Sequence, residues 1–446
     1  MSMTYPLPQA FSARMRAQLG PRADAYFAAL EQPFCRGLRP NPRKPVSSPI
    51  DGLGDPIPWA PGRFLTPESQ AGSDPLHEAG AYYLQEPSAM APVAVLAPRP
   101  GERVLDLCAA PGGKSTQIGA ALCGQGLLVS NEPVPNRAKI LSRNLERMGI
   151  PNALVVSAEP EQLAPLWTGA FDAVLVDAPC SGEGMFRRHP ETRAEWSEAS
   201  ALGCAARQKR ILDCAARMLR PGGRLVYSTC TFHEAENEQV IEWLLGEHTD
   251  FTRVPFTLPI GDGRTLDAPR GMARLYPHEL PGEGHFVALL RREMREAESA
   301  PVFLPARERL SSPDPALLAA HAAFAKPFGP LPPANAQMGD KLLSAPDLPP
   351  LRGIKVLRAG CCLGTLKGRV FAPDHALAMA LPLPYSLPTL PLTREQALRY
   401  QAGEALPCPE SLAGYVLPTY EGLALGFGKC SGGQMKNHYP KGLRRP

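Results

Sequence analysis

The chain has 446 residues, of which 44% are hydrophobic and 20% are charged, and its formal net charge is +4. This length exceeds one ordinary hydrophobic core, so we expect a soluble globular protein with two to four domains. No run approaches the roughly 20 apolar residues that cross a bilayer, and the first residues lack the basic and apolar segments of a signal peptide. We therefore expect a cytoplasmic protein that has no membrane partner.

The eleven cysteines argue against two further classes of protein. An odd number without regular spacing does not form a disulfide framework, which agrees with a reducing compartment. The sequence has no Cys-x-x-Cys pair, so we expect no zinc site and assign no metal ligands. The mildly basic net charge permits an RNA partner without requiring one, so the argument for RNA depends on local clusters.

Residues 1–75 form the first region of the chain, which we expect to support the protein or to bind RNA. A helix is predicted over residues 8–30, because apolar side chains recur there at helical spacing. Its apolar positions are Phe11, Met15, Leu19, Tyr26, Phe27 and Leu30. A basic stretch follows at residues 36–44, and the proline and glycine content up to about residue 75 predicts irregular structure.

Residues 76–293 are predicted to form an α/β domain with a parallel, doubly wound sheet. Short apolar runs, typical of buried parallel strands, alternate with helical stretches such as residues 135–148 and 199–219. The strand candidates are residues 104–107, 127–130, 154–157, 173–177, 225–228 and 286–290. Proline-rich residues 294–350 are predicted to be a loose connection, and residues 351–446 to be one or two small appended modules.

A turn of small residues follows the first strand of the α/β domain. It consists of Cys108, Ala109, Ala110, Pro111, Gly112, Gly113 and Lys114. Small residues let the backbone approach a ligand, and free amides at a helix start favour an anionic group. A P-loop would need glycine at position 108, and a dinucleotide site would need a glycine pattern that is absent. S-adenosylmethionine fits better, because Glu132 follows the second strand, where a carboxylate can accept hydrogen bonds from ribose hydroxyls.

Two cysteines follow strands of the same sheet. Cys180 lies in the segment Asp-Ala-Pro-Cys-Ser-Gly and Cys230 in Ser-Thr-Cys-Thr. Either alone is best explained as an ordinary buried cysteine, but two at strand ends indicate a thiol nucleophile beside a bound cofactor. A thiolate that adds to carbon 6 of a pyrimidine makes carbon 5 nucleophilic enough to take a methyl group, and a second thiol can assist release. Asp177 is placed to hydrogen-bond the base and stabilise the developing charge.

Residues 100–292 resemble the Sun/Fmu family of RNA cytosine-5 methyltransferases. The segments that carry the resemblance are residues 106–114, 177–182, 228–231 and 283–286. The resemblance implies a Rossmann-like class I methyltransferase domain that binds S-adenosylmethionine through the 108–114 turn, Glu132 and Asp177. It also implies that Cys230 is the nucleophile, that Cys180 aids product release and that Asp177 contacts the base. DNA cytosine methyltransferases attack with the cysteine of the Pro-Cys motif instead, so the presence of both cysteines points to RNA.

The chain departs from this family at the adenine site. The family usually places Asp after the third strand to hold the adenine amino group, and this chain has Glu159 there. Glu159 is therefore the expected substitute. Near the thiols, Arg187 and Arg188 have two open interpretations, since they either hold the substrate backbone or form a surface charge pair.

Two segments extend the resemblance beyond the catalytic domain. Residues 36–41 are similar to an amino-terminal element of the bacterial ribosomal RNA branch, and residues 428–444 resemble the PUA-like tail of bacterial enzymes that methylate 16S ribosomal RNA. In that tail, lysines would hold phosphates, and His438 and Tyr439 would offer stacking surfaces for unpaired RNA. The resemblance thus implies an N-terminal extension and a small PUA-like C-terminal module that binds RNA.

Together these observations predict a monomeric cytoplasmic enzyme that uses S-adenosylmethionine to methylate cytosine C5 in 16S ribosomal RNA or in the small ribosomal subunit. A transfer RNA or 23S ribosomal RNA methyltransferase is the alternative within the same chemistry. A non-catalytic RNA-binding ribosome assembly factor is the alternative from another class. The presence of Cys180, Cys230 and Asp177 argues against the second alternative, because binding alone requires none of them.

Overall fold

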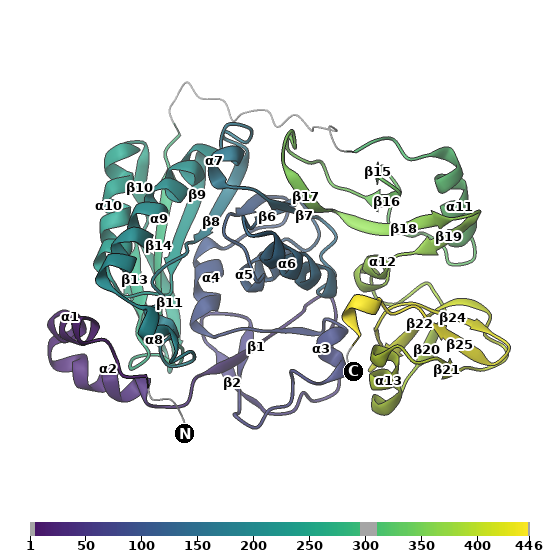
Figure 1. The fold of residues 1–446 in the computed structure, drawn as a ribbon, viewed down its shortest axis with the longest axis horizontal. Coiled ribbons are helices and arrows are strands. Elements are labelled where there is room, and N and C mark those ends of the chain that lie inside the picture. The colour runs from purple at the N-terminus through teal and green to yellow at the C-terminus, as the bar shows by residue number, and fades with distance from the viewer. Residues whose placement is uncertain (1–4, 295–309, 445–446) are drawn as a thin grey trace.

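The computed structural model describes residues 5–294 and 310–444, and a nine-stranded sheet lies at its centre (Figure 1). The strands follow the order β10-β14-β9-β8-β5-β6-β7-β17, and β13 pairs with β14. Their bounds are β5 Arg103–Asp106, β6 Leu127–Asn131, β7 Ala153–Ser157, β8 Phe171–Asp177, β9 Leu219–Thr229, β10 Phe251–Arg253, β13 Met272–Leu275, β14 His285–Arg292 and β17 Lys355–Ala359. Strands β5 to β9 are parallel, and β14 inserts antiparallel to β9. All six strand candidates are strands, and the domain is a Rossmann-like α/β domain. The prediction of a parallel sheet is wrong for residues 286–290, because β14 runs antiparallel to β9.

Helices cover both faces of this sheet, and alternate residues of each strand contribute to two separate cores. Leu105 packs with residues of α9 and α10, whereas its neighbour Val104 packs with residues of α4, α5 and α6. The helices are α4 Ala91–Leu96, α5 Gly113–Ala121, α6 Pro135–Arg147, α7 Pro160–Leu163, α8 Thr192–Glu195, α9 Glu198–Met218 and α10 Glu238–Glu247. A hairpin of β11 Phe256–Gly261 and β12 Arg264–Ala268 lies outside the sheet. Among the described residues, no helix combines the length and the apolar character needed to cross a membrane.

The N-terminal region differs from its prediction in two ways. The expected helix is broken into α1 Gln9–Leu19 and α2 Ala23–Leu30, because Gly20 has φ +54° and Pro21 follows it. The segment predicted to be irregular forms a four-stranded sheet in the order β2-β3-β1-β4. Its bounds are β1 Arg36–Pro40, β2 Leu53–Ile57, β3 Gly62–Leu65 and β4 Tyr82–Leu84, with α3 Pro75–Glu78 before the last strand.

The described part of the proline-rich connection is more ordered than the sequence predicts. It holds α11 Pro315–Ala325 and the strands β15 Ala336–Met338 and β16 Lys341–Ser344. These two strands form a second four-stranded sheet with β18 Cys361–Lys367 and β19 Val370–Pro373. Between these strands the chain returns to the central sheet, where β17 pairs antiparallel with β7. The indole of Trp167 donates a hydrogen bond to the carbonyl of Pro350 at 2.7 Å, which fixes this return. Helix α12 His375–Ala380 follows β19.

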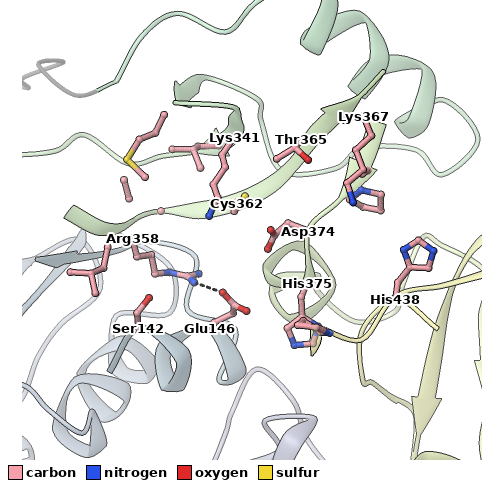
Figure 2. Close-up of a pocket in the computed structure, with 18 residues that line it drawn as sticks. Ser142, Glu146, Lys341, Arg358, Cys362, Thr365, Lys367, Asp374, His375 and His438 are labelled. Atoms are coloured by element: carbon pink, nitrogen blue, oxygen red, sulfur yellow. Dashed lines mark hydrogen bonds and ion pairs between the residues drawn. The ribbon is translucent and has the colours of Figure 1, made fainter. Parts of the chain in front are cut away.

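The last module lies beside the N-terminal sheet and α3 (Figure 1). Its elements are β20 Thr389–Pro391, α13 Arg394–Ala402, β21 Leu406–Pro407, β22 Gly414–Tyr420, β23 Leu423–Ala424, β24 Gly428–Ser431 and β25 Gln434–Asn437. Leu38 and Tyr82 of the N-terminal sheet share one core with Leu406 and Met435 of this module. The C-terminal modules are therefore packed onto the rest of the protein through β17, through α12 against α6 and through this core. Figure 2 shows the second of these contacts, with Glu146 on α6.

Candidate active site

The two predicted thiols lie side by side at the carboxyl edge of the central sheet. Strands β8 and β9 are parallel neighbours, with Asp177 in register with Ser228. The loops that follow them bring the Sγ atoms of Cys180 and Cys230 to 3.1 Å from each other. Both cysteines are free and partly exposed. The expectation that two strand-end cysteines meet at one site is met by this geometry.

A buried carboxylate and several further polar contacts hold the two cysteine loops together. Glu236 is fully buried and accepts hydrogen bonds from the backbone N–H of Ser181 at 2.9 Å and from the Gln208 amide at 3.0 Å. The Ser181 and Thr231 hydroxyls lie 3.0 Å apart, which links the two loops directly. A backbone hydrogen bond of 2.8 Å from Gly184 to the carbonyl of Cys230 adds a further link. The spacing of the sulfurs is thus fixed by polar contacts behind them.

Asp177 lies at the centre of a charged network. The Lys114 ammonium is 2.7 Å from one carboxylate oxygen, and the other accepts a hydrogen bond from Ser228 at 2.8 Å and lies 3.7 Å from Nε2 of His285. Burial alone would raise the pKa of Asp177, but Lys114 and His285 outweigh it and hold the pKa below its ordinary value. Burial alone would lower the pKa of Lys114, but Asp177 outweighs this effect and raises that pKa above its ordinary value. Both groups therefore remain charged at neutral pH.

The Cys180 thiol is held in its protonated form. The hydrogen bond to Cys230 and burial together raise the pKa of Cys180 well above its ordinary value. A protonated thiol at this distance can donate its hydrogen to the sulfur of Cys230. The arrangement therefore provides a proton donor next to the second sulfur.

The small-residue turn has a backbone conformation that requires glycine, and it leads into the start of a helix. Gly112 has φ +114°, where L side chains are strained, and a Cβ there would meet the Leu141 side chain at 3.2 Å. Helix α5 begins at the next residue, so its free N–H groups point toward the turn. The Asp106 carboxylate is fully buried behind the turn and accepts a hydrogen bond from Ser115 at 2.6 Å, while its Oδ1 atom has no partner. An unpartnered buried acceptor indicates room for a donor from a ligand.

The two predicted nucleotide-binding acids lie in different surroundings. Glu132 is buried at the end of β6, where its carboxylate accepts from the N–H of Val134 at 3.1 Å and faces Arg137 at 3.4 Å. Glu159 is exposed at the end of β7, where it starts α7 and forms a capping box with Gln162. The residues of the turn and Glu132 therefore fit S-adenosylmethionine, with an anion site at a helix start and an acid at the next strand end.

His285 is the site residue that sequence reasoning missed. It belongs to the segment 283–286 that carries part of the family resemblance, and its ring lies 3.4 Å from the Lys114 ammonium and close to Asp177. Lys114 itself was expected to hold the cofactor, whereas its side chain contacts Asp177. The strand order could have indicated this, because a residue that starts an antiparallel β14 beside β9 must lie near the end of β9.

Arg187 and Arg188 have different environments. They therefore do not form a surface charge pair, and they do not both face a substrate backbone. Arg187 is buried, makes a 2.7 Å ion pair with the buried Glu283, and donates to the carbonyl of Gly282 at 2.6 Å. It is a structural residue and does not face solvent. Arg188 is exposed and lies over the ring of Phe34.

Three side chains of the segments expected to contact RNA are buried, and two of them support the fold as the other interpretation of the N-terminal region predicts. Tyr439 is buried in the core shared by the N-terminal sheet and the last module, so it cannot stack on a base. His438 is exposed. In the basic stretch, Arg39 is 1% exposed and donates to Thr116 at 2.6 Å, and Lys44 is buried on backbone carbonyls. These two cations hold the N-terminal sheet against the catalytic domain.

Four family models match consecutive parts of the chain. Residues 93–291 match the 16S rRNA methyltransferase RsmB/F model, and residues 7–87 match the N-terminal domain of 16S rRNA methyltransferase RsmF. Residues 323–381 match the RsmF rRNA methyltransferase first C-terminal domain, and residues 387–445 match the methyltransferase RsmF PUA domain. The matched order is the order of the modules in the structure.

Relatives and solved structures agree with these matches. The ribosomal RNA small subunit methyltransferase F of Klebsiella pneumoniae is 33% identical over 99% of this chain and 97% of its own length, and that of Salmonella arizonae is 33% identical over 98% and 96%. A methyltransferase homolog from Pyrococcus horikoshii has a TM-score of 0.55 and 30% identity, covering 64% of this chain and 95% of its own. NSun6 from the same organism, solved with SFG, has a TM-score of 0.56 at 20% identity over 65% of this chain and 99% of its own, and shares the fold. The chain belongs to the RsmB/F family of 16S ribosomal RNA methyltransferases, in its RsmF branch.

Proposed function

We propose that this chain is an S-adenosylmethionine-dependent methyltransferase that methylates carbon 5 of cytosine in 16S ribosomal RNA. The observation that carries the proposal is the pair of thiols 3.1 Å apart beside the charged Asp177–Lys114 pair. A nucleophilic thiol next to an activating network is what covalent catalysis on a pyrimidine requires. The names of the full-length relatives support 16S ribosomal RNA as the target.

In the proposed mechanism, Cys230 attacks carbon 6 of the cytosine. The Asp177 carboxylate accepts a hydrogen bond from the exocyclic amino group, and the Lys114 ammonium donates toward the ring nitrogen that gains negative charge. Placing cations and acceptors in a protected site stabilises that charge without moving solvent. S-adenosylmethionine, when bound, supplies the electrophilic methyl group that carbon 5 then takes.

Release of the product needs the carbon 6–sulfur bond to break. The Cys180 thiol donates its proton to the Cys230 sulfur as that bond breaks, which matches the raised pKa of Cys180. In the same step Cys180 accepts the proton that leaves carbon 5, and the electrons of that carbon–hydrogen bond form the carbon 5–carbon 6 double bond as the sulfur departs. Cys180 is thereby restored as a thiol, and Cys230 regains a proton in place of the one that it lost to solvent before its attack. One proton is released for each methyl group transferred.

For the cofactor, we propose that the backbone of residues 108–114 binds the methionine part, while the Lys114 side chain stays with Asp177, and that Glu132 accepts hydrogen bonds from the ribose hydroxyls. Glu159 is proposed at the adenine amino group from its place at the end of β7, the strand next to Glu132. We further propose that the enzyme acts as a monomer, because both thiols, Asp177 and the turn come from one chain. We also propose that it acts in the cytoplasm.

The test of this function is methyl transfer to separate RNA substrates. Purified protein with S-adenosylmethionine should methylate unmodified 16S ribosomal RNA or small subunits, and bisulfite sequencing should place the mark on cytosine. Cytosine methylation confined to 23S ribosomal RNA or transfer RNA would overturn the 16S assignment. RNA binding without methyl transfer to any of these substrates would instead indicate a non-catalytic assembly factor.

A further inference from the structure

His285 is buried in the network around Asp177, and the mechanism described so far gives its ring no role. The residue begins β14, and its side chain is 7% exposed. Its Nδ1 atom lies 2.9 Å from the carbonyl oxygen of Gly284 and 3.4 Å from the Ser88 hydroxyl. Across the ring, Nε2 lies 3.4 Å from the Lys114 ammonium and 3.7 Å from Oδ1 of Asp177. The two ring nitrogens thus have different partners, and these partners decide which nitrogen carries the proton.

The partners of Nδ1 can only accept a hydrogen bond from it. The Gly284 carbonyl has no proton to donate. The Ser88 hydroxyl gives its single proton to the Glu86 carboxylate at 2.5 Å and accepts from the N–H of Gly284 at 3.1 Å. Nδ1 therefore carries the hydrogen of the neutral ring, and Nε2 is left with its lone pair.

The lone pair of Nε2 is an acceptor for the Lys114 ammonium. A lysine ammonium has three N–H donors. One of them is directed to Oδ2 of Asp177 at 2.7 Å, and a second meets Nε2 of His285 at 3.4 Å. Because Lys114 is buried, water does not readily replace either acceptor. Two engaged donors prevent the ammonium from turning about its bond to the side chain, so the third donor has one direction.

We propose that His285, in its neutral Nδ1–H form, is a positioning residue that aims the third donor of Lys114 at the target base. The inference rests on the proposed function, in which Lys114 donates to the ring nitrogen that gains negative charge. A donor that is held in place beforehand needs no reorientation as this charge develops. Its benefit therefore falls on the transition state rather than on the binding of RNA.

Protonation of His285 reverses this arrangement. The new hydrogen on Nε2 turns to Asp177, whose carboxylate it stabilises, and a second cation then lies 3.4 Å from the Lys114 ammonium. Lys114 loses an acceptor and is repelled, so the positioning is lost at low pH. The titratable groups that face the ring or its hydrogen-bond partners are Lys114 on α5, Asp177 at the end of β8, Asp106 at the end of β5, Cys230 after β9, Glu86 before α4 and Glu283 before β14.

The test compares two substitutions that each keep one half of the hydrogen bonds of the imidazole. His285→Gln keeps an acceptor near the position of Nε2 and does not titrate, whereas His285→Asn keeps a donor near the position of Nδ1 and loses the acceptor. Steady-state methylation of a 16S ribosomal RNA transcript at pH 8 gives kcat and KM for both. We expect His285→Asn to lower kcat by about tenfold or more, the effect of one hydrogen bond to a charged group. His285→Gln should restore most of that loss, and KM for RNA, affinity for S-adenosylmethionine and the urea midpoint should agree between the two variants.

A pH series separates positioning from packing. The ratio of the kcat of the unmodified protein to that of His285→Gln should fall as the pH is lowered from 8 to 5.5, because only the imidazole gains a proton. The titrations of Cys230 and Asp106 occur in both proteins and cancel in the ratio. Nitrogen-15 NMR of ligand-free protein with labelled histidine should show His285 as the Nδ1–H tautomer at pH 8. The signal is assigned by its absence from His285→Gln.

Three results would overturn the inference: an Nε2–H tautomer, equal kcat values for His285→Asn and His285→Gln, or a ratio that does not vary with pH. If His285→Asn does not fold, the tautomer and the ratio still decide. Failure of the proposed function is distinguishable, because it would appear as absent cytosine methylation by the unmodified protein. The tautomer measurement would then still test the contact of His285 with Lys114.

Discussion

Two carboxylates of the site, Asp177 and Asp106, lie in opposite electrostatic environments. Asp177 is surrounded by an ammonium, a hydroxyl and an imidazole, so its pKa is held low and it remains a carboxylate. Asp106 is fully buried with one hydroxyl donor, and burial raises its pKa to about 7. The first group can therefore accept hydrogen bonds throughout the neutral range, while the second gains and loses its proton within it.

The raised pKa of Asp106 predicts a pH-dependent stability effect. The folded protein binds a proton that the unfolded chain releases near pH 3.8, so stability falls as pH rises toward 7. A change from 3.8 to about 7 corresponds to at most about 4 kcal/mol. Asp106→Asn should therefore stabilise the ligand-free protein more at pH 8 than at pH 5, measured by urea unfolding, with Asp340→Asn at an exposed position as the control. A difference that does not vary with pH would contradict the account.

Glu132 and Glu159 offer a matched comparison for the cofactor site. Glu132 is buried at a strand end beside the turn, whereas Glu159 is exposed and caps a short helix. Losing a charged acceptor for two ribose hydroxyls should cost Glu132→Ala at least about tenfold in affinity for S-adenosylmethionine. Glu159→Ala should cost less, and titration calorimetry measures both. Equal affinities for unmodified protein and Glu132→Ala would remove the ribose assignment.

At the scale of elements, a buried ion pair joins the loop after β8 to the segment before β14. The Arg187 and Glu283 side chains are 6% and 2% exposed and 2.7 Å apart. Arg187 also donates to the carbonyl of Ala29 at 3.1 Å, so the pair ties the end of α2 to the catalytic domain. Removing one partner of such a pair leaves a buried charge without compensation.

Arg187→Ala should therefore lower the free energy of unfolding by roughly 3–5 kcal/mol. Arg188→Ala, at the neighbouring exposed position, should change it by less than about 0.5 kcal/mol. Denaturant unfolding monitored by circular dichroism compares the two variants. Equal stabilities would mean that the ion pair does not hold these elements together, and Arg187 would return as a candidate for RNA contact.

The sequence predicted the elements whose evidence is local. Six strands were identifiable because their buried residues form continuous apolar runs, as in the five parallel strands β5 to β9 and in the antiparallel β14. The two thiols could be placed together because both follow parallel strands. The N-terminal strands were missed because they have only three to five residues and contain Pro40 and Pro56. The contact of His285 with Lys114 spans 171 positions and depends on how β14 inserts, which no local pattern records.

At the scale of the whole molecule, the C-terminal half completes the catalytic domain. Residues 355–359 supply the edge strand of the central sheet, and Ile354 and Ala359 belong to its core. The last module shares a second core with the N-terminal sheet, where the buried Tyr439 ring packs. The modules are therefore joined by apolar contacts rather than by linkers alone.

A chain that ends at residue 350 should consequently unfold at a temperature at least about 5 °C below that of the full chain. It would lose the β7–β17 pairing and expose apolar surface on both cores. Thermal unfolding followed by circular dichroism provides the measurement. Identical unfolding temperatures would show that the catalytic domain is independent of the C-terminal modules.

The most direct test of the account is covalent trapping of RNA by the two cysteine variants. If Cys230 attacks and Cys180 protonates its sulfur, Cys230→Ala should neither methylate 16S ribosomal RNA nor form an adduct. Cys180→Ala should transfer the methyl group and then stall, leaving a protein–RNA complex that survives a denaturing gel. Because the two sulfurs lie 3.1 Å apart, either variant still has one thiol beside the target base. A trapped complex in Cys230→Ala, and none in Cys180→Ala, would reverse the two roles and contradict the mechanism.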